Sequence, residues 1–190
     1  MERQELQAIR HQEWVSTKGA LELPVQIDTY LQARQRARHN WLRTHVEGTV
    51  LEVGCSWGYV LAYVEGHAGV DINPALVVLA RLLARTRQFE VGTATALPFE
   101  SATFDTVMLP EVLEHLDWEQ VQAAIREAVR VAKRKVLVTI PDGRYDTDDT
   151  NNGKHHWLLD ERRAYDVATY LGNGVSLEYV AGFACFEKDL

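Results

Sequence analysis

Beyond residue 48, short runs of apolar residues alternate with stretches in which apolar residues recur every three or four positions. Short apolar runs predict buried strands, and the three- to four-residue spacing predicts amphipathic helices. The expected strands, in chain order, are residues 49–55, 68–72, 89–94, 104–109, 135–140, 175–180 and 183–188. The expected helices among them are residues 59–64, 74–85, 118–132 and 161–171. Strands that alternate with helices in this way are typical of a doubly wound, mostly parallel α/β sheet, here of seven strands.

The two ends of the chain depart from this alternation. Residues 2–15 and 25–46 are predicted to be helical, and the last two strands have no helix between them. We therefore expect a single domain in which residues 1–47 form an N-terminal helical lid and residues 48–190 form an α/β core that ends in an antiparallel hairpin. Four arginines of the second N-terminal helix are expected on its solvated face: Arg34, Arg36, Arg38 and Arg43.

Composition and charge narrow the possible functions. The 190 residues are 46% hydrophobic and 25% charged, which are ordinary values for a globular chain. The net charge of −7 disfavours nucleic acids and anionic membranes as partners. Cys55 and Cys185 are too few for a disulfide framework, and no signal peptide or membrane-spanning stretch is apparent. We expect a cytoplasmic protein that does not associate with membranes, and its oligomeric state stays open.

The candidate chemistry begins where the first expected strand ends, in Leu51-Glu52-Val53-Gly54-Cys55-Ser56-Trp57-Gly58. Glycines at 54 and 58 allow the backbone to approach a ligand closely before the next helix begins. Such a turn alone is a weak signal, because it also helps a strand turn into a helix. Glu52 adds to it, since a carboxylate in a buried strand is costly unless it meets a cation or hydrogen-bond donors.

Asp71 supplies the second part of the signal. It ends the second expected strand, 17 residues after Gly54. An acid at this point can accept both ribose hydroxyls of a nucleoside cofactor, although it can also simply cap a helix. Glu52 then distinguishes between cofactors, because its charge would repel the pyrophosphate of NAD and attract a cofactor that carries an ammonium group. This favours S-adenosylmethionine.

With these residues the sequence resembles the class I S-adenosylmethionine-dependent methyltransferases. The segments that carry the resemblance are Leu51–Gly58, Gly69–Pro74, Val91–Phe99, Phe104–Val107 and Glu111–Leu116. Together these motifs are specific, whereas each alone is not. The resemblance implies a Rossmann-like seven-stranded core and S-adenosylmethionine as the cofactor.

The resemblance also implies which residues surround the methionine portion of the cofactor. Glu52 is expected to face its ammonium group, commonly through a water molecule. The residues expected to border this portion are Gly54, Ser56 and Gly58 in the turn, with Leu109 and Pro110 close by. The family usually has glycine at the middle position of the turn, and Ser56 is tolerated there if its backbone keeps a negative φ.

At the adenosine end, Asp71 is expected to hold the ribose and Ile72 to pack on the adenine. The backbone N–H of Ala94 is expected to meet the adenine ring. Thr93 stands where the family usually has an aspartate that accepts a hydrogen bond from the adenine amino group. Because a threonine accepts such a bond without charge, cofactor affinity is expected to depend more on Asp71.

Methyl transfer is an in-line displacement with a neutral thioether as leaving group, so the enzyme mainly supplies alignment. A general base is needed only when the acceptor must lose a proton. His115 is the candidate base, and the alternative is a histidine that only positions a loop. His155 and His156 are expected to bind substrate, because the family often has a histidine at the substrate mouth. We expect methylation of a small molecule on oxygen or nitrogen.

Two alternatives remain open. Glu111, Glu114, His115 and His156 loosely match the metal ligands of the small-RNA 3′-terminal ribose 2′-O-methyltransferases. However, Glu111–Leu116 is a common sequence among ordinary family members, and the acidic chain disfavours RNA, so the site is expected to work without a metal. The second alternative is a protein that binds S-adenosylmethionine without catalysis, which the departures at Ser56 and Thr93 would permit.

Overall fold

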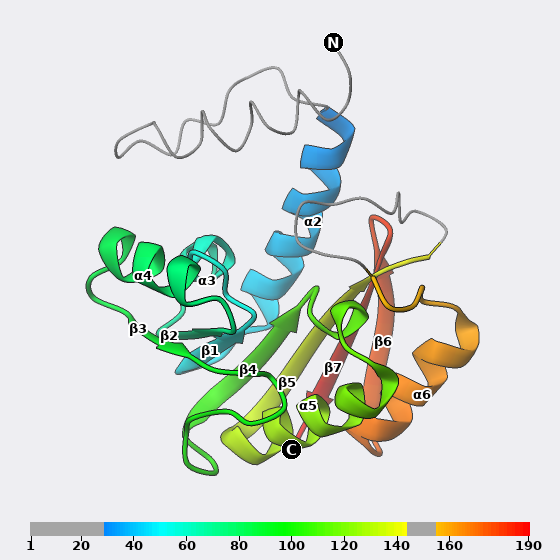
Figure 1. The fold of residues 1–190 in the computed structure, drawn as a ribbon. Coiled ribbons are helices and arrows are strands. Elements are labelled where there is room, and N and C mark those ends of the chain that lie inside the picture. The colour runs from blue at the N-terminus through cyan, green and yellow to red at the C-terminus, as the bar shows by residue number, and fades with distance from the viewer. Residues whose placement is uncertain (1–28, 144–154) are drawn as a thin grey trace.

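Seven strands form one sheet in the order β3-β2-β1-β4-β5-β7-β6 (Figure 1). The computed structural model describes residues 29–143 and 155–190, so the expected helix over residues 2–15 lies outside the described residues. The strands are β1 (Val50–Val53), β2 (Ala68–Asp71), β3 (Gln88–Val91), β4 (Phe104–Pro110), β5 (Ala132–Pro141), β6 (Val175–Val180) and β7 (Phe183–Asp189). All seven coincide with the strands expected from the sequence, within a few residues at each end.

The pairing of the strands confirms the doubly wound architecture. Strands β1 to β5 pair in parallel with their neighbours, with Leu51 opposite Ala68 and Val50 opposite Thr106. Strand β7 runs antiparallel to both β5 and β6, which confirms the C-terminal hairpin at one edge. The carboxyl ends of β1, β2, β3 and β4 therefore meet at one edge of the sheet, which is where ligands bind in such folds.

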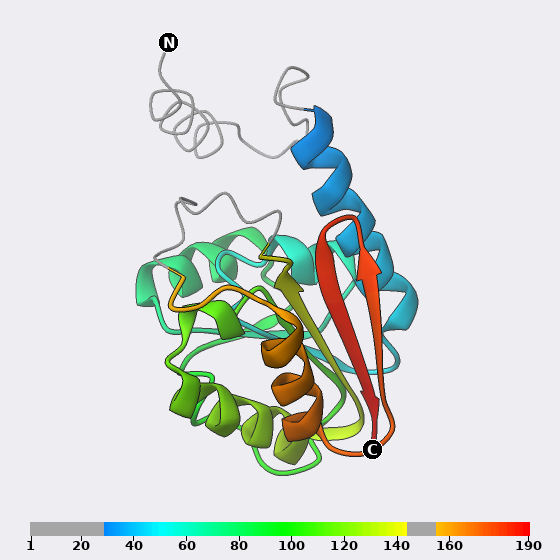
Figure 2. The ribbon, with the colours of Figure 1, turned by 90° about the vertical axis from the view of Figure 1, so that its right-hand side faces the viewer.

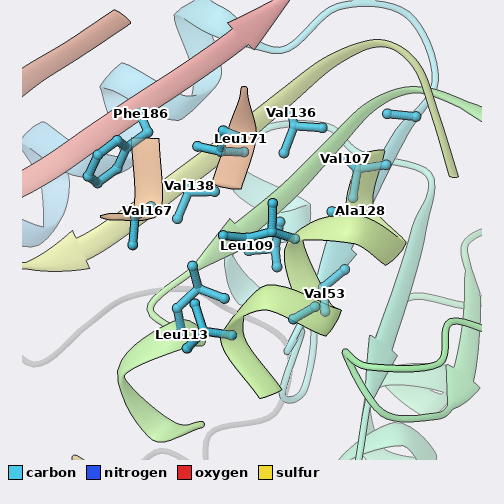
Figure 3. Packing of buried hydrophobic residues seen from close by; sticks show 14 of the residues in the cluster. Val53, Val107, Leu109, Leu113, Ala128, Val136, Val138, Val167, Leu171 and Phe186 are labelled. Atoms are coloured by element: carbon cyan, nitrogen blue, oxygen red, sulfur yellow. The ribbon is translucent and has the colours of Figure 1, made fainter. Parts of the chain in front are cut away.

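Helices cover both faces of the sheet (Figure 2). They are α2 (Thr29–His45), α3 (Tyr59–Tyr63), α4 (Pro74–Leu83), α5 (Trp118–Val131) and α6 (Glu161–Leu171), with a short 3₁₀ helix, η1 (Leu113–His115). One core cluster joins the sheet to α5 and α6, and its packing is seen in Figure 3. A second cluster joins the opposite face to α2, α3 and α4.

Local signals explain where the helices begin. Asn73 caps α4 by accepting a hydrogen bond from the Ala75 N–H at 3.0 Å, and Pro74 follows at the first helical position. Asp117 begins α5 through a capping box with Gln120. The end of α5 differs from expectation, because the helix stops at Val131 and Ala132 passes directly into β5.

The burial of two arginines corrects the expected solvated face of α2. Arg36 and Arg43 are exposed, whereas Arg34 and Arg38 are buried. The spacing of four residues places both on the side of α2 that lies against the β6–β7 hairpin (Figure 2). The guanidinium of Arg34 donates to the carbonyl oxygens of Ala181 (2.7 Å) and Gly182 (3.1 Å) in the hairpin turn. Burial is possible because these carbonyls satisfy the charged donors.

Candidate functional site

The turn after β1 has an unusual backbone conformation. Gly54 and Gly58 have φ values of +72° and +89°, which glycine adopts without strain. A Cβ atom at position 54 would lie 2.5 Å from the Val112 side chain, so this turn passes close to the segment after β4. Ser56 has φ +50°, so the condition under which a serine would be tolerated here, a negative φ, is not met. A serine in this left-handed region is strained, which suits a position that the family usually fills with glycine.

Asp71 holds this turn in place. Its Oδ2 accepts a hydrogen bond from the Ser56 N–H at 2.7 Å, and its Oδ1 accepts one from the Asn73 N–H at 2.8 Å. Asp71 is not the cap of α4, because Asn73 has that role. Each carboxylate oxygen has a second lone pair, so both can still accept a ligand hydroxyl. The carboxylate therefore links two loops and is able to hold vicinal hydroxyls at the same edge of the sheet.

Glu52 is buried in β1 with 2% of its surface exposed. Among the described residues, its Oε2 atom has no hydrogen-bond partner. Burial raises the pKa of this carboxyl well above its usual value, although a backbone hydrogen bond from Leu61 and the charge of Arg38 oppose the rise. A buried acid with one oxygen that lacks a hydrogen-bond partner is complementary to a cationic group. The ammonium group of S-adenosylmethionine therefore fits beside Glu52.

The adenine side of the site lies at the ends of β2 and β3. Ile72 is 74% exposed, which is unusual for an isoleucine and leaves its side chain accessible to a flat apolar ligand. The Thr93 hydroxyl lies 3.0 Å from the Thr95 hydroxyl, and Ala94 between them is half-buried. The Gly92 N–H donates to the Asp71 carbonyl, which ties this loop to β2. Thr93 thus has a partner of its own in place of the charge that an aspartate would bring.

The segment after β4 lies next to the turn after β1. Leu109 and Pro110 are buried at the end of β4, and Glu111 follows with φ +55°. The Glu111 carboxylate accepts a hydrogen bond from the buried Arg38 in an ion pair whose Glu111 side is partly exposed. Glu111 therefore pairs with α2, and it is not part of the group of possible ligand atoms that contains His115 and His155.

The structure brings together His115 and His155 but not the four metal ligands of the alternative. The rings of His115 and His155 meet edge to face with their centroids 4.8 Å apart. Potential ligand atoms of Glu114, His115 and His155 all lie within 4.8 Å of one another. His156 instead lies with its Nδ1 2.6 Å from the Asp117 carboxylate. The cluster that could hold a cation thus contains His155 in place of His156, and Glu111 is excluded by its pairing with Arg38.

A cavity of about 310 Å³ adjoins this cluster. Its lining residues are Asp117, Trp118, His155, His156, Trp157 and Arg163. The rings of Trp118 and Trp157 meet edge to face at 5.3 Å, and the Arg163 guanidinium lies 4.1 Å above Trp118. Trp157 and Arg163 are not predicted as site residues from the sequence. The one signal in the sequence that points to Trp157 is its position next to His155 and His156.

The arrangement is that of the class I S-adenosylmethionine-dependent methyltransferases, and comparisons with known proteins agree. Residues 51–140 match the sequence model of a family described as a methyltransferase domain. This match confirms the resemblance, and S-adenosylmethionine is the cofactor that it implies. Among the described residues, no helix has the length and apolar character needed to cross a bilayer.

Curated relatives match part of the chain. Norajmaline N-methyltransferase of Rauvolfia serpentina is 31% identical over 94 residues, which make up 44% of this chain and 32% of that protein. The uncharacterized methyltransferase YcgJ of Bacillus subtilis is 31% identical over 108 residues, which make up 52% of this chain and 39% of that protein. The chain thus covers less than two thirds of either relative.

A solved structure matches over nearly the whole chain. Magnesium protoporphyrin IX methyltransferase from Synechocystis PCC 6803, with bound S-adenosylmethionine, superposes with a TM-score of 0.64 and 19% identity. The match covers 98% of this chain and 94% of that chain. At this identity the likeness shows a shared fold.

Proposed function

We propose that this protein transfers the methyl group of S-adenosylmethionine to an oxygen or nitrogen atom of a small-molecule acceptor. The observation that carries the proposal is the buried Glu52 carboxyl, whose Oε2 atom has no hydrogen-bond partner among the described residues and which lies in the strand before a left-handed turn that Asp71 holds. Together these residues offer one acid for the ammonium group and one for the ribose of the cofactor.

The chemistry asks little of the protein beyond orientation. When bound, the cofactor supplies a sulfonium methyl group whose displacement leaves a neutral thioether. Glu52 and Asp71 fix the two ends of the cofactor, and Leu109-Pro110 bounds the space near the methionine end. Alignment of this kind accounts for a large share of the barrier reduction in such displacements, about 7–11 kcal/mol in well-oriented systems.

His115 is proposed as the group that accepts a proton when the acceptor is a hydroxyl or a protonated amine. It lies at the end of η1, four residues after Glu111, and contacts His155 at the cavity. Two indoles and a guanidinium in the cavity wall favour a planar acceptor of small size. His155 and His156 line the same cavity and are proposed to contact this acceptor.

The test is a turnover assay with S-adenosylmethionine labelled at the methyl group and a panel of planar small molecules that bear hydroxyl or amino groups. We expect label transfer to at least one acceptor, without a metal requirement, and loss of at least 100-fold in rate for His115→Asn at unchanged cofactor affinity. Unchanged turnover of His115→Asn would remove the base from the proposal, and binding without turnover on any acceptor would favour a non-catalytic protein.

A second candidate function is metal-assisted methylation of a ribose 2′-hydroxyl. It is favoured by one observation, the closeness of Glu114, His115 and His155, which offer one carboxylate and two imidazoles. In that case a chelator should abolish turnover and a divalent ion should restore it. Addition of Mn²⁺ alone should also raise the melting temperature of wild type and not of His155→Asn.

A further inference from the structure

Arg38 has a buried donor for which the fold provides no partner. The residue lies in α2 and is 5% exposed. Its Nη1 donates to Glu111, and its Nη2 lies 2.7 Å from the His39 ring nitrogen Nε2. The guanidinium also lies 5.2 Å from the centre of the Phe183 ring. Its Nε–H, however, has no hydrogen-bond partner among the described residues. Because a guanidinium donates through all three nitrogens, one direction of binding remains unused.

Two further buried polar atoms without hydrogen-bond partners in the described chain face the same side of the sheet. They are Glu52 Oε2 in β1 and Thr139 Oγ1 in β5. Val50 and Leu137, two residues before each of these, pack in the cluster that contains Trp41 and Leu42 of α2. Since side chains alternate along a strand, Glu52 and Thr139 also point towards α2. An unsatisfied buried polar atom costs about 1–3 kcal/mol, so three of them on one side of a sheet indicate a site for a polar ligand group.

The charges of this group are complementary to an amino acid. Arg38 is near enough to Glu52 to influence its ionisation, and Glu111, which Arg38 binds, lies directly after Leu109-Pro110 at the methionine end. One cationic donor and one anionic acceptor thus lie beside the turn after β1. A carboxylate and an ammonium group on one carbon atom would satisfy both at once.

We propose that Arg38 binds the carboxylate of the cofactor's amino-acid end while Glu52 binds its ammonium group, so that α2 forms part of the cofactor site. This inference rests on the proposed function, because it requires S-adenosylmethionine to be the ligand. Arg38, which is expected from the sequence to lie on a solvated face of α2, would then have a role in binding the cofactor. A purely structural role is the competing explanation, since Arg38 also holds Glu111 and packs on Phe183.

Three ligands distinguish a binding role of Arg38 from a purely structural role. They are S-adenosylhomocysteine, its decarboxylated analogue and 5′-methylthioadenosine. The second ligand lacks only the carboxylate, and the third lacks both charged groups. Titration calorimetry is performed on wild type, Arg38→Gln, Glu52→Gln and the matched control Arg34→Gln. Arg34 is also buried in α2 and lies 5.1 Å from the Phe183 ring, but it binds the hairpin turn.

We expect Arg38→Gln to weaken S-adenosylhomocysteine about 10- to 100-fold and to leave the decarboxylated analogue unchanged. Glu52→Gln should weaken both ligands that carry an ammonium group and leave 5′-methylthioadenosine unchanged. Arg34→Gln should leave all three affinities unchanged, even if its melting temperature falls.

Equal weakening of all three ligands by Arg38→Gln would overturn the inference in favour of a structural role. Wild type alone gives a second criterion that does not depend on a variant that folds. If wild type binds S-adenosylhomocysteine and its decarboxylated analogue equally well, the inference is wrong and the proposed function stands. If wild type binds none of the three ligands, both are wrong.

Discussion

Asp71 shows at the scale of one residue how structural and binding roles combine. We expect Asp71→Ala to weaken S-adenosylhomocysteine by about 2–3 kcal/mol, because two charge-assisted bonds to ribose hydroxyls are lost and water replaces them only in part. Calorimetry on the folded variant measures this loss. Asp71→Asn is the matched control, since it retains an acceptor for the Ser56 N–H or the Asn73 N–H without the charge. Unchanged affinity in a folded Asp71→Ala variant would remove this residue from the site.

Glu52 predicts a pH dependence. Its pKa is raised in the folded protein by burial, and the groups that face it are Arg38 from α2, Asp71 from β2 and Cys55 in the turn. A raised carboxyl pKa means that the folded state holds the proton more tightly than the unfolded state. The stabilisation is therefore complete below the usual carboxyl pKa of 4.5 and is lost as the pH rises through the raised value.

Glu52→Gln isolates this effect. The free energy of unfolding of ligand-free wild type, relative to Glu52→Gln, should fall as the pH rises above about 4.5. Urea unfolding over a pH series measures the difference. S-adenosylhomocysteine should in addition release a proton on binding to wild type, because its ammonium group favours the ionised acid. Parallel stability curves for the two proteins would contradict the prediction.

At the scale of an element, the turn between β1 and α3 carries strain at one position. Ser56 has φ +50°, a conformation that costs an L-residue about 1–2 kcal/mol. Ser56→Gly should relieve this cost, less about 0.5–1 kcal/mol of added chain entropy, and so stabilise the protein by up to about 1 kcal/mol. Gly54→Ala is the opposite case, because its Cβ would lie 2.5 Å from Val112 and φ is +72°. Thermal unfolding measures both, and destabilisation by Ser56→Gly would show that the serine hydroxyl contributes more than its backbone costs.

The elements themselves are well predicted from the sequence, because their signals are local. The Asn73-Pro74 start of α4 and the apolar runs of β4 and β5 depend only on neighbouring residues. The roles of Arg34 and Arg38 are not predicted, since the burial of Arg34 depends on the Ala181 carbonyl, 147 residues away in sequence. The positive φ of Ser56 is likewise not predicted from its neighbours in the sequence.

The candidate site likewise contains residues that local motifs predict and contacts that they do not predict. Glu52, Gly54 and Asp71 belong to motifs with fixed spacing, and the structure brings them to one edge of the sheet. The pairing of His115 with His155 instead of His156 depends on tertiary contacts, because the His156 ring lies against Asp117, and spacing alone does not distinguish adjacent histidines. The cavity that Trp118 and Trp157 help to line likewise requires two segments 39 positions apart in sequence to meet.

At the scale of the whole molecule, the order of the strands explains why these groups converge. The strand order reverses between β1 and β4, and the carboxyl ends at such a reversal are where ligands bind in folds of this kind. Glu52 lies in β1 on the face of the sheet that packs against α2, the helix that contains Arg38. Helix η1 and the start of α5 follow β4 in the chain. Ligand binding should therefore join α2, the sheet and the segment after β4 into one cooperative unit.

This coupling leads to a prediction for the stability of the entire domain. A ligand that binds only the native state at 100 times its dissociation constant adds about 2.7 kcal/mol to the free energy of unfolding. For a domain of this size the melting temperature should rise by about 5–10 °C with S-adenosylhomocysteine. NAD should cause no rise, because it has no ammonium group to pair with Glu52 and its pyrophosphate would further oppose the ionisation of this acid. Differential scanning fluorimetry with both ligands measures the effect, and Asp71→Ala at the same ligand concentration is the control, with a much smaller rise expected. A rise with NAD and none with S-adenosylhomocysteine would reverse the cofactor assignment.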